Sequence, residues 1–427
     1  MGLSPFMEIR QWDRVGLPVG ECSRRLQRLA YLDRACMKVE AGHMIARPEY
    51  EVKGALGRLV WQDAEHHNQL RGRCQQLRMS SVAFDKCPDE DLRFLMEEAL
   101  KSSSTLELLV ALFGVIKPAQ LKAIEAYRKE TQPLVDEPTL HLLAHQEMDR
   151  KKQLAWGEEA IIELSDSLPE ETIEEARRWG AYLEHLLSLA GGVDGKHAKP
   201  DKDPAQTVER EDFVLPKKSA RDGRFRTSEL KFDGMHLDAT EQGRFRTMLY
   251  HRFFEMSPAE GIARVHYLSE NKPWGFYYDT ARHLWDEVRH SWFGEAALRA
   301  RGEDIYEAPN WVGWHDMAAN AFSVEEAYIH LTIAIEKAGM KYPPGKREEW
   351  EFCRDVVQDP LMTTFQDFDW ADEVIHAGFG QKWIVETVFG GDTRKAMEAA
   401  DRTVKIRQAY MDRLQGKQTD NGFAGNY

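Results

Sequence analysis

The sequence predicts an all-α protein made of two tandem four-helix bundles joined by an extended linker. Three observations lead to this prediction. Apolar residues recur at three- and four-residue spacing along most of the chain, while the alternating pattern of strands is scarce. A stretch in the middle of the chain changes composition. Two short runs, Asp286–His290 and Asp372–His376, share the pattern D-E-x-x-H.

Residues 1–190 are predicted to form the first bundle. Pro48 separates the first two helices, and Pro138 falls in the first turn of the helix near 138–163, where a proline is tolerated. Helices are expected near 20–46, 51–78, 89–101, 104–131, 138–163 and 168–190.

Residues 191–238 are predicted to be a linker or an extended arm on the surface. Gly, Pro, Lys and Asp dominate most of this stretch and apolar residues are few. Such a composition cannot bury enough surface to form a core of its own.

The second bundle is predicted over residues 239–415, followed by a flexible tail at 416–427. Pro273 breaks the pattern between its first two helices, and Ser323 with Glu326 forms a capping box. Helices are expected near 240–270, 274–301, 323–338, 345–358, 365–389 and 392–414.

Composition excludes several classes of protein. The 427 residues are 42% hydrophobic and 30% charged, which is typical of globular domains. No run of 18 apolar residues predicts a membrane span, and the N-terminus has no apolar leader. The five scattered cysteines contain no C-x-x-C and indicate a reducing, cytoplasmic location. A net charge of −14 argues against broad nucleic-acid binding.

The two D-E-x-x-H runs predict a metal site. Chance would give only about 0.1–0.2 such matches in a chain of this composition, and two occur. On a helix, Glu287 and His290 share one face, as do Glu373 and His376. Asp286 and Asp372 lie on the same side and are expected to accept the outer N–H of a ligating imidazole. Two such helices, with one glutamate from each of two further helices, make a two-metal site in a bundle.

Geometry leaves the two further glutamates open. A partner of Glu287 across the turn near residue 272 should lie near residue 257, because both helices rise equally per residue. Glu255 and Glu260 both satisfy this. The later helix offers Glu325, Glu326 and Glu336. Nearby histidines are expected on the surface or in the core: His251, His266, His283 and His330.

The first bundle is interpreted as a diverged copy with a degenerate site. Aligning Glu65 with Glu287 puts Asn68 at the position of His290, and Arg150 falls at the position of His376. Arg150 would then place a fixed cation where a metal charge had been. The remnants are Glu40, Glu65, Asn68, Glu125, Glu147 and Arg150. A differently liganded second site stays open, with candidates Glu40, His43, Asp63, Glu65, His66, His67, Glu125 and Glu147.

Three segments within residues 240–390 resemble the ferritin-like di-iron carboxylate superfamily, in particular the bacterial families related to the di-iron tRNA hydroxylase. The first runs from Glu255-Met-Ser-Pro-Ala-Glu260 to the first D-E-x-x-H run. The others are Ile335–Pro343 and Asp369–Trp383. The resemblance implies a ferritin-like bundle that holds two iron ions, with manganese as the alternative, and the first bundle is expected to be ferritin-like as its diverged copy. It implies these ligands: Glu260, Glu287, His290, Glu336, Glu373 and His376.

The leading hypothesis is an oxygen-activating di-iron oxidase or monooxygenase acting on a small organic molecule. No flavin or nicotinamide fingerprint is present, so electrons would come from an external donor. A homodimer is left open. The alternatives are a ferroxidase or iron-handling protein, and a non-enzymatic helical scaffold with relic sites.

Overall fold

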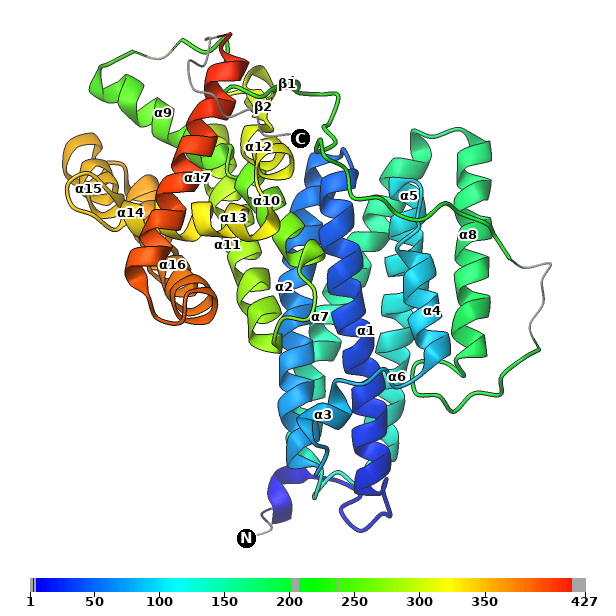
Figure 1. The fold of residues 1–427 in the computed structure, drawn as a ribbon. Coiled ribbons are helices and arrows are strands. Elements are labelled where there is room, and N and C mark those ends of the chain that lie inside the picture. Colours follow the sequence, from blue (N-terminus) through cyan, green and yellow to red (C-terminus); the bar gives the residue numbers. More distant parts are fainter. Residues whose placement is uncertain (1–2, 4, 202–206, 237, 417–427) are drawn as a thin grey trace. The chain divides into compact units, whose positions relative to one another are not determined.

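The structure is a computed structural model and describes residues 3, 5–201, 207–236 and 238–416 (Figure 1). Helices dominate these residues, which confirms the predicted all-α class, and one two-stranded sheet accompanies them. No helix in the described ranges is long and apolar enough to cross a membrane. Of the predicted tail, only Gly416 lies within the described residues.

The contacts divide the chain into two units. The first comprises Met1–Val39 and Gln62–Val214, and the second comprises Glu40–Trp61 and Leu215–Tyr427. The division after Val214 falls inside the predicted linker, 191–238. The division differs from the predicted one at residues 40–61, which group with the second unit.

The first unit contains long helices whose ends follow local sequence signals. Asp89 and Ser104 each cap a helix with side-chain bonds to backbone N–H groups, and Pro138 lies in the first turn of α7. Its elements, two of them shared with the second unit, are η1 (Pro5–Glu8), α1 (Val19–Ala46), α2 (Tyr50–Gln76), α3 (Ser81–Phe84), α4 (Glu90–Ala99), α5 (Thr105–Leu109), the π-helix η2 (Val110–Ile116), α6 (Lys117–Glu130), α7 (Glu137–Asp166) and α8 (Glu170–Leu189).

The second unit adds the sheet and the remaining helices. Strand β1 (Arg226–Ser228) pairs in parallel with β2 (Pro309–Trp311), and Arg226 lies opposite Pro309. The helices are α9 (Glu241–Phe253), α10 (Met256–Leu268), α11 (Trp274–Arg299), η4 (Ile305–Glu307), α12 (Gly313–Ala321), α13 (Val324–Ile329), η5 (His330–Glu336), α14 (Lys337–Gly339), α15 (Lys346–Glu351), η6 (Phe352–Val357), α16 (Pro360–Phe379), η7 (Gly380–Val388) and α17 (Thr393–Leu414).

Two departures from the predicted helices shape the interior of the second unit. The expected helix at 240–270 is broken between α9 and α10, at Phe254 and Glu255. The expected helix at 323–338 contains the π-helix η5, which ends at Glu336. Its start is as predicted, because Ser323 and Glu326 form the capping box.

Candidate metal centre

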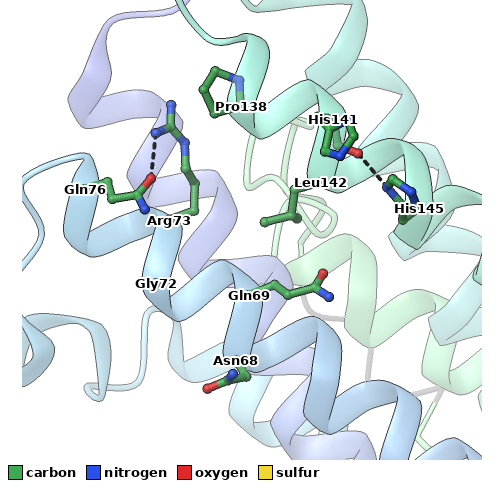
Figure 2. Close-up of a pocket in the computed structure, with 9 residues that line it drawn as sticks. All are labelled: Asn68, Gln69, Gly72, Arg73, Gln76, Pro138, His141, Leu142 and His145. Carbon is green, nitrogen blue, oxygen red and sulfur yellow. Dashed lines mark hydrogen bonds between the residues drawn. The ribbon is translucent and has the colours of Figure 1, made fainter.

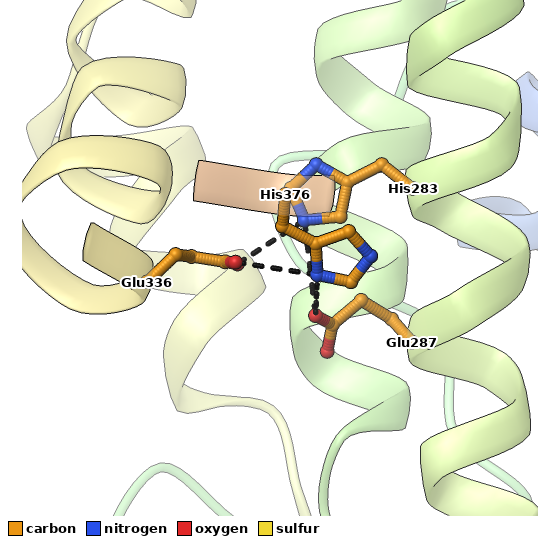
Figure 3. Close-up of side chains that lie close together, drawn as sticks. All are labelled: His283, Glu287, Glu336 and His376. Atoms are coloured by element: carbon orange, nitrogen blue, oxygen red, sulfur yellow. Dashed lines mark hydrogen bonds and ion pairs between the residues drawn. The ribbon is translucent and has the colours of Figure 1, made fainter. Parts of the chain in front are cut away.

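Carboxylate and imidazole side chains gather in the interior of the second unit. Their oxygen and nitrogen atoms form three groups, and within each group these atoms lie within 4.8 Å of one another. The groups are His283, Glu287, Glu336 and His376 (Figure 3); Glu255, Glu287 and His290; and His290, Asp369 and Glu373. All members are buried. The structure thus brings together five of the six residues expected as ligands, and Glu260 is the exception.

Each histidine of the D-E-x-x-H runs is held by the aspartate of the other run. His376 Nε2 lies 3.2 Å from Asp286 Oδ2, and His290 Nε2 lies 3.2 Å from Asp372 Oδ2. An ionised carboxylate only accepts hydrogen bonds, so each Nε2 carries the hydrogen. The Asp–His pairs expected from the sequence therefore cross between α11 and α16.

Two arginines of α11 hold the aspartates in place. Arg289 donates to Asp286 and, at 2.7 Å, to Asp372. Arg282 donates at 2.8 Å to Asp286 and at 3.4 Å to Asp372. Burial raises the pKa of Asp286, but the bond from His376 and the two guanidinium groups outweigh it and hold that pKa well below its usual range. Asp286 is therefore ionised.

The second ring nitrogen of each histidine faces carboxylates. His376 Nδ1 lies 3.2 Å from Glu336 Oε2 and 3.6 Å from Glu373 Oε2, and His290 Nδ1 lies 3.6 Å from Glu255 Oε2. Neither Nδ1 makes a hydrogen bond to any described residue. An imidazole fixed through one nitrogen, with the other directed at carboxylates, is the usual state of a metal-ligating histidine.

The carboxylates of the centre repel one another. Burial raises the pKa of Glu287 far above its usual range, and Glu255, Glu336 and Glu373 raise it further. Burial and the charge of Glu373 likewise raise the pKa of Glu336 far above its usual range. Burial opposes a charge on His376, yet Glu336 outweighs it and holds the pKa of that imidazole well above its usual range. Without a cation, protons must offset this concentrated negative charge.

Two basic side chains already neutralise part of the centre. Lys346 Nζ lies 2.7 Å from Glu373 Oε1 and 3.1 Å from both carboxylate oxygens of Asp369. Arg252 pairs with Glu255 and lies 3.2 Å from Asp369. Burial raises the pKa of Glu373, but Lys346 outweighs it and holds that pKa well below its usual range.

Glu260 belongs to a different network, which corrects its expected place among the ligands. Lys53 Nζ lies 2.8 Å from its carboxylate, Arg221 binds both of its oxygens, and Ser219 donates to it at 2.6 Å. Burial raises the pKa of Glu260, but Arg221 and Lys53 outweigh the effect of burial and lower this pKa to about 2. With two buried cations against one carboxylate, this site has no need of a metal ion. Glu255, the alternative that geometry had left open, lies in the cluster instead.

His283 and Asp369 join the centre without having been expected as ligands. Each lies four residues before the glutamate of its D-E-x-x-H run, so it shares the inward face of that helix. An extended pattern, His/Asp-x-x-D-E-x-x-H, could have found both. The other three neighbouring histidines lie outside the three groups: His251, His266 and His330.

Searches of family models, of curated proteins and of solved structures found no match to this chain. The family resemblance therefore stays a prediction from the sequence, and the function has to be argued from the geometry.

The interior of the first unit contains a charge-balanced network. Arg150 binds Asp33 and, at 2.6 Å, Asp63, while Lys117 Nζ lies 2.9 Å from Asp63. All four side chains are at most 1% exposed. Burial raises the pKa of Asp63, but Arg150 and Lys117 outweigh the effect of burial and lower this pKa to about 2. Two aspartates and two basic side chains leave no net charge for a metal ion to offset. Asp33 and Asp63 also form a group of potential ligands with His66, and Arg150 and Lys117 together supply the positive charge beside them.

The other residues expected around Arg150 lie elsewhere. Glu65 and Glu125 are half-buried, and Glu147 pairs with Arg128 and Lys151. Glu40 is buried and groups with the second unit. Asn68 lines a pocket of about 560 Å³ between α2 and α7, together with Arg73, His141 and His145 (Figure 2). Asp33 and Asp63, not the aligned glutamates, meet Arg150, because they lie on the inward faces of α1 and α2.

A small cavity of about 180 Å³ lies beside the centre of the second unit. Its wall includes the aromatic side chains of Phe276, Tyr328 and Trp383. Tyr328 lines the cavity, and the centroid of its ring is 5.9 Å from that of His283 in the cluster. The Tyr328 hydroxyl is buried and has no hydrogen-bond partner among the described residues.

Proposed function

We propose that the second unit binds two metal ions between α10, α11, η5 and α16, which together act as a ferritin-like four-helix bundle. One observation carries this proposal: each D-E-x-x-H histidine is fixed through Nε2 by an aspartate of the other helix, and its Nδ1 faces carboxylates without a hydrogen bond. The ligands would be Glu255, Glu287, His290, Glu336, Glu373 and His376.

The donor set suits iron or manganese. Carboxylate oxygens and neutral imidazoles are the ligands these ions take, and Glu287 belongs to two of the groups, as a bridging ligand would. The raised pKa values of Glu287 and Glu336 point the same way, because a divalent cation would offset the repulsion that raises them.

We infer that the protein is an oxidase or monooxygenase that acts on a small, largely apolar molecule. Bound iron supplies the reduction of O2. In a monooxygenation, one oxygen atom enters the substrate and the other leaves as water, with two electrons from an external donor and two protons. The cavity beside Tyr328 is the binding site we favour for the substrate, since its wall is mostly aromatic and aliphatic.

Metal analysis and oxygen uptake of the full chain test this function. The wild type grown with added iron should carry about two iron ions per chain, as other two-metal centres do, and should consume O2 when given a reductant. Glu287→Ala should lose both properties. Glu398→Ala, which removes an exposed glutamate of α17, is the matched control and should keep them.

Each rival function gives a different result in the same experiment. An iron-handling protein would carry far more than two ions per chain. A scaffold with relic sites would bind equally little metal in the wild type and in Glu287→Ala. Either result would reject the oxidase proposal.

A further inference from the structure

The two helices of the centre differ at one corresponding position. Four residues before its glutamate, α11 carries His283 and α16 carries Asp369. Both side chains are fully buried and both belong to a group of potential ligands. The same place on the two helices therefore offers different chemistry.

His283 lies among carboxylates that contact no Lys or Arg within the described residues. Its Nε2 is 3.1 Å from Glu336 Oε1 and 3.8 Å from Glu287 Oε1, and its ring stacks on that of His376 with centroids 4.0 Å apart. Figure 3 shows these four side chains converging from α11, η5 and α16. Two carboxylates with two imidazoles would neutralise one divalent cation.

Asp369 lies on the side of the centre that holds fixed positive charge. Lys346 contacts Asp369 and Glu373, and Arg252 contacts Asp369 and Glu255. The three carboxylates there already face two cations. Arg252 also pairs with Glu349 at 2.6 Å. A divalent ion here would have to draw Asp369, Glu373 and Glu255 away from buried ion pairs that they already make, which costs free energy.

We propose that His283 is a direct metal ligand and that the two metal positions are unequal. The position formed by His283, Glu287, Glu336 and His376 fills first. The position formed by Glu255, His290, Asp369 and Glu373 fills second and more weakly, because Lys346 and Arg252 compete for its carboxylates. This inference rests on the proposed two-metal site and deepens it.

Calorimetric titration of the metal-free full chain with Co²⁺ alone tests whether the two metal positions differ in affinity. Two binding steps are expected, and the second should be at least about tenfold weaker, since a unit charge a few ångströms away acts strongly at the effective dielectric of a buried site. Two equal steps would overturn the inference and leave the two-metal site standing. No binding at all would overturn both.

Variants assign each step to its position. His283→Gln should weaken the first step, whereas His266→Gln, which removes a buried histidine bonded to Thr280, should change neither. Lys346→Met should strengthen the second step at least about tenfold, for the same electrostatic reason. The control for Lys346→Met is Lys382→Met, which removes a half-exposed lysine paired with Asp279 and should leave the second step unchanged. The Lys346 comparison stands even if His283→Gln does not fold.

Crystals grown with one equivalent of Co²⁺ locate the first ion directly. A single anomalous peak beside His283 Nε2 and Glu336 is expected. A peak beside Glu255 and Asp369, or equal peaks at both positions, would overturn the assignment.

Discussion

Glu255 and Glu260 lie five residues apart, and their neighbours give them opposite roles. Glu260 is enclosed by Lys53 and Arg221, so its charge is already matched. Glu255 pairs with Arg252 and forms a group of potential ligands with Glu287 and His290. The break between α9 and α10 places Glu255 at the start of a new helix and directs it to the cluster.

Replacing each of these glutamates by glutamine separates metal binding from stability. Glu255→Gln should lower the bound metal with little loss of stability. Glu260→Gln should keep the metal but lower the free energy of unfolding by about 3–5 kcal/mol, because Lys53 and Arg221 stay buried without their partner. Metal analysis and urea unfolding measure the two effects, and metal loss in Glu260→Gln alone would restore Glu260 as a ligand.

The stabilisation by Glu260 should depend on pH in a defined direction. Its pKa in the folded protein is about 2, below the ordinary value of 4.5. A lowered carboxyl pKa stabilises the fold above the ordinary value, and the effect is lost as the pH falls through the folded value. The stability difference between the wild type and Glu260→Gln should therefore be full above about pH 4.5 and shrink toward pH 2. A difference that grows on acidification would contradict the ion-pair explanation.

Tyr328 carries a buried hydroxyl without a hydrogen-bond partner, which lowers stability. Tyr328→Phe should therefore raise the free energy of unfolding by up to about 1 kcal/mol and leave the metal content unchanged. Thermal unfolding measures the change. A clear loss of stability would show that the hydroxyl has a hydrogen-bond partner in solution.

At the scale of elements, the centre joins α11 to α16 through reciprocal bonds. Asp286 of α11 holds His376 of α16, and Asp372 of α16 holds His290 of α11. The π-helix η5 brings Glu336 to the same place, and such wide turns often occur at functional sites. The ligands therefore depend on the packing of three elements distant in sequence.

The crossed aspartates give a prediction for this scale. Asp286→Asn and Asp372→Asn should each weaken metal binding by about 10–100-fold, because the imidazole loses the acceptor that fixes its orientation. The control is Asp279→Asn, on the same helix as Asp286. The Asp279 carboxylate binds Lys382 and Trp383, and its loss should have little effect on metal affinity. Competition with a chelator measures the affinities. Equal losses in Asp279→Asn would indicate a general effect of charge.

At the scale of the whole molecule, the two units satisfy their buried carboxylates differently. In the first unit, Lys117 and Arg150 neutralise Asp33 and Asp63. In the second, Lys346 and Arg252 neutralise only part of the charge of the centre. We therefore expect metal only in the second unit.

Arg150→Met tests this difference. It should lower the free energy of unfolding by about 3–5 kcal/mol, because two buried aspartates lose a partner, while the metal content stays at that of the wild type. Chemical denaturation and metal analysis of one preparation give both values. A loss of metal in Arg150→Met without unfolding would place a metal ion in the first unit.

Local pattern was enough to predict the all-α class and most helix positions, because spacing, prolines and the Ser323 capping box act within a few residues. It also singled out Glu287, His290, Glu373 and His376, to which the family resemblance added Glu336, and the structure brings these five together. The break at Glu255 was missed, although Pro258 in the first turn of α10 is a local signal of a helix start.

The sequence by itself determined which helix faces carry carboxylates and imidazoles, because the 3.6-residue repeat fixes which side chains share a face. Only the tertiary structure decided their partners. It paired Glu260 with Lys53 and Arg221, crossed the aspartates between α11 and α16, and placed His283 beside Glu336. Charge balance in a buried site is a sum over side chains from several helices, and no single stretch of sequence contains that sum.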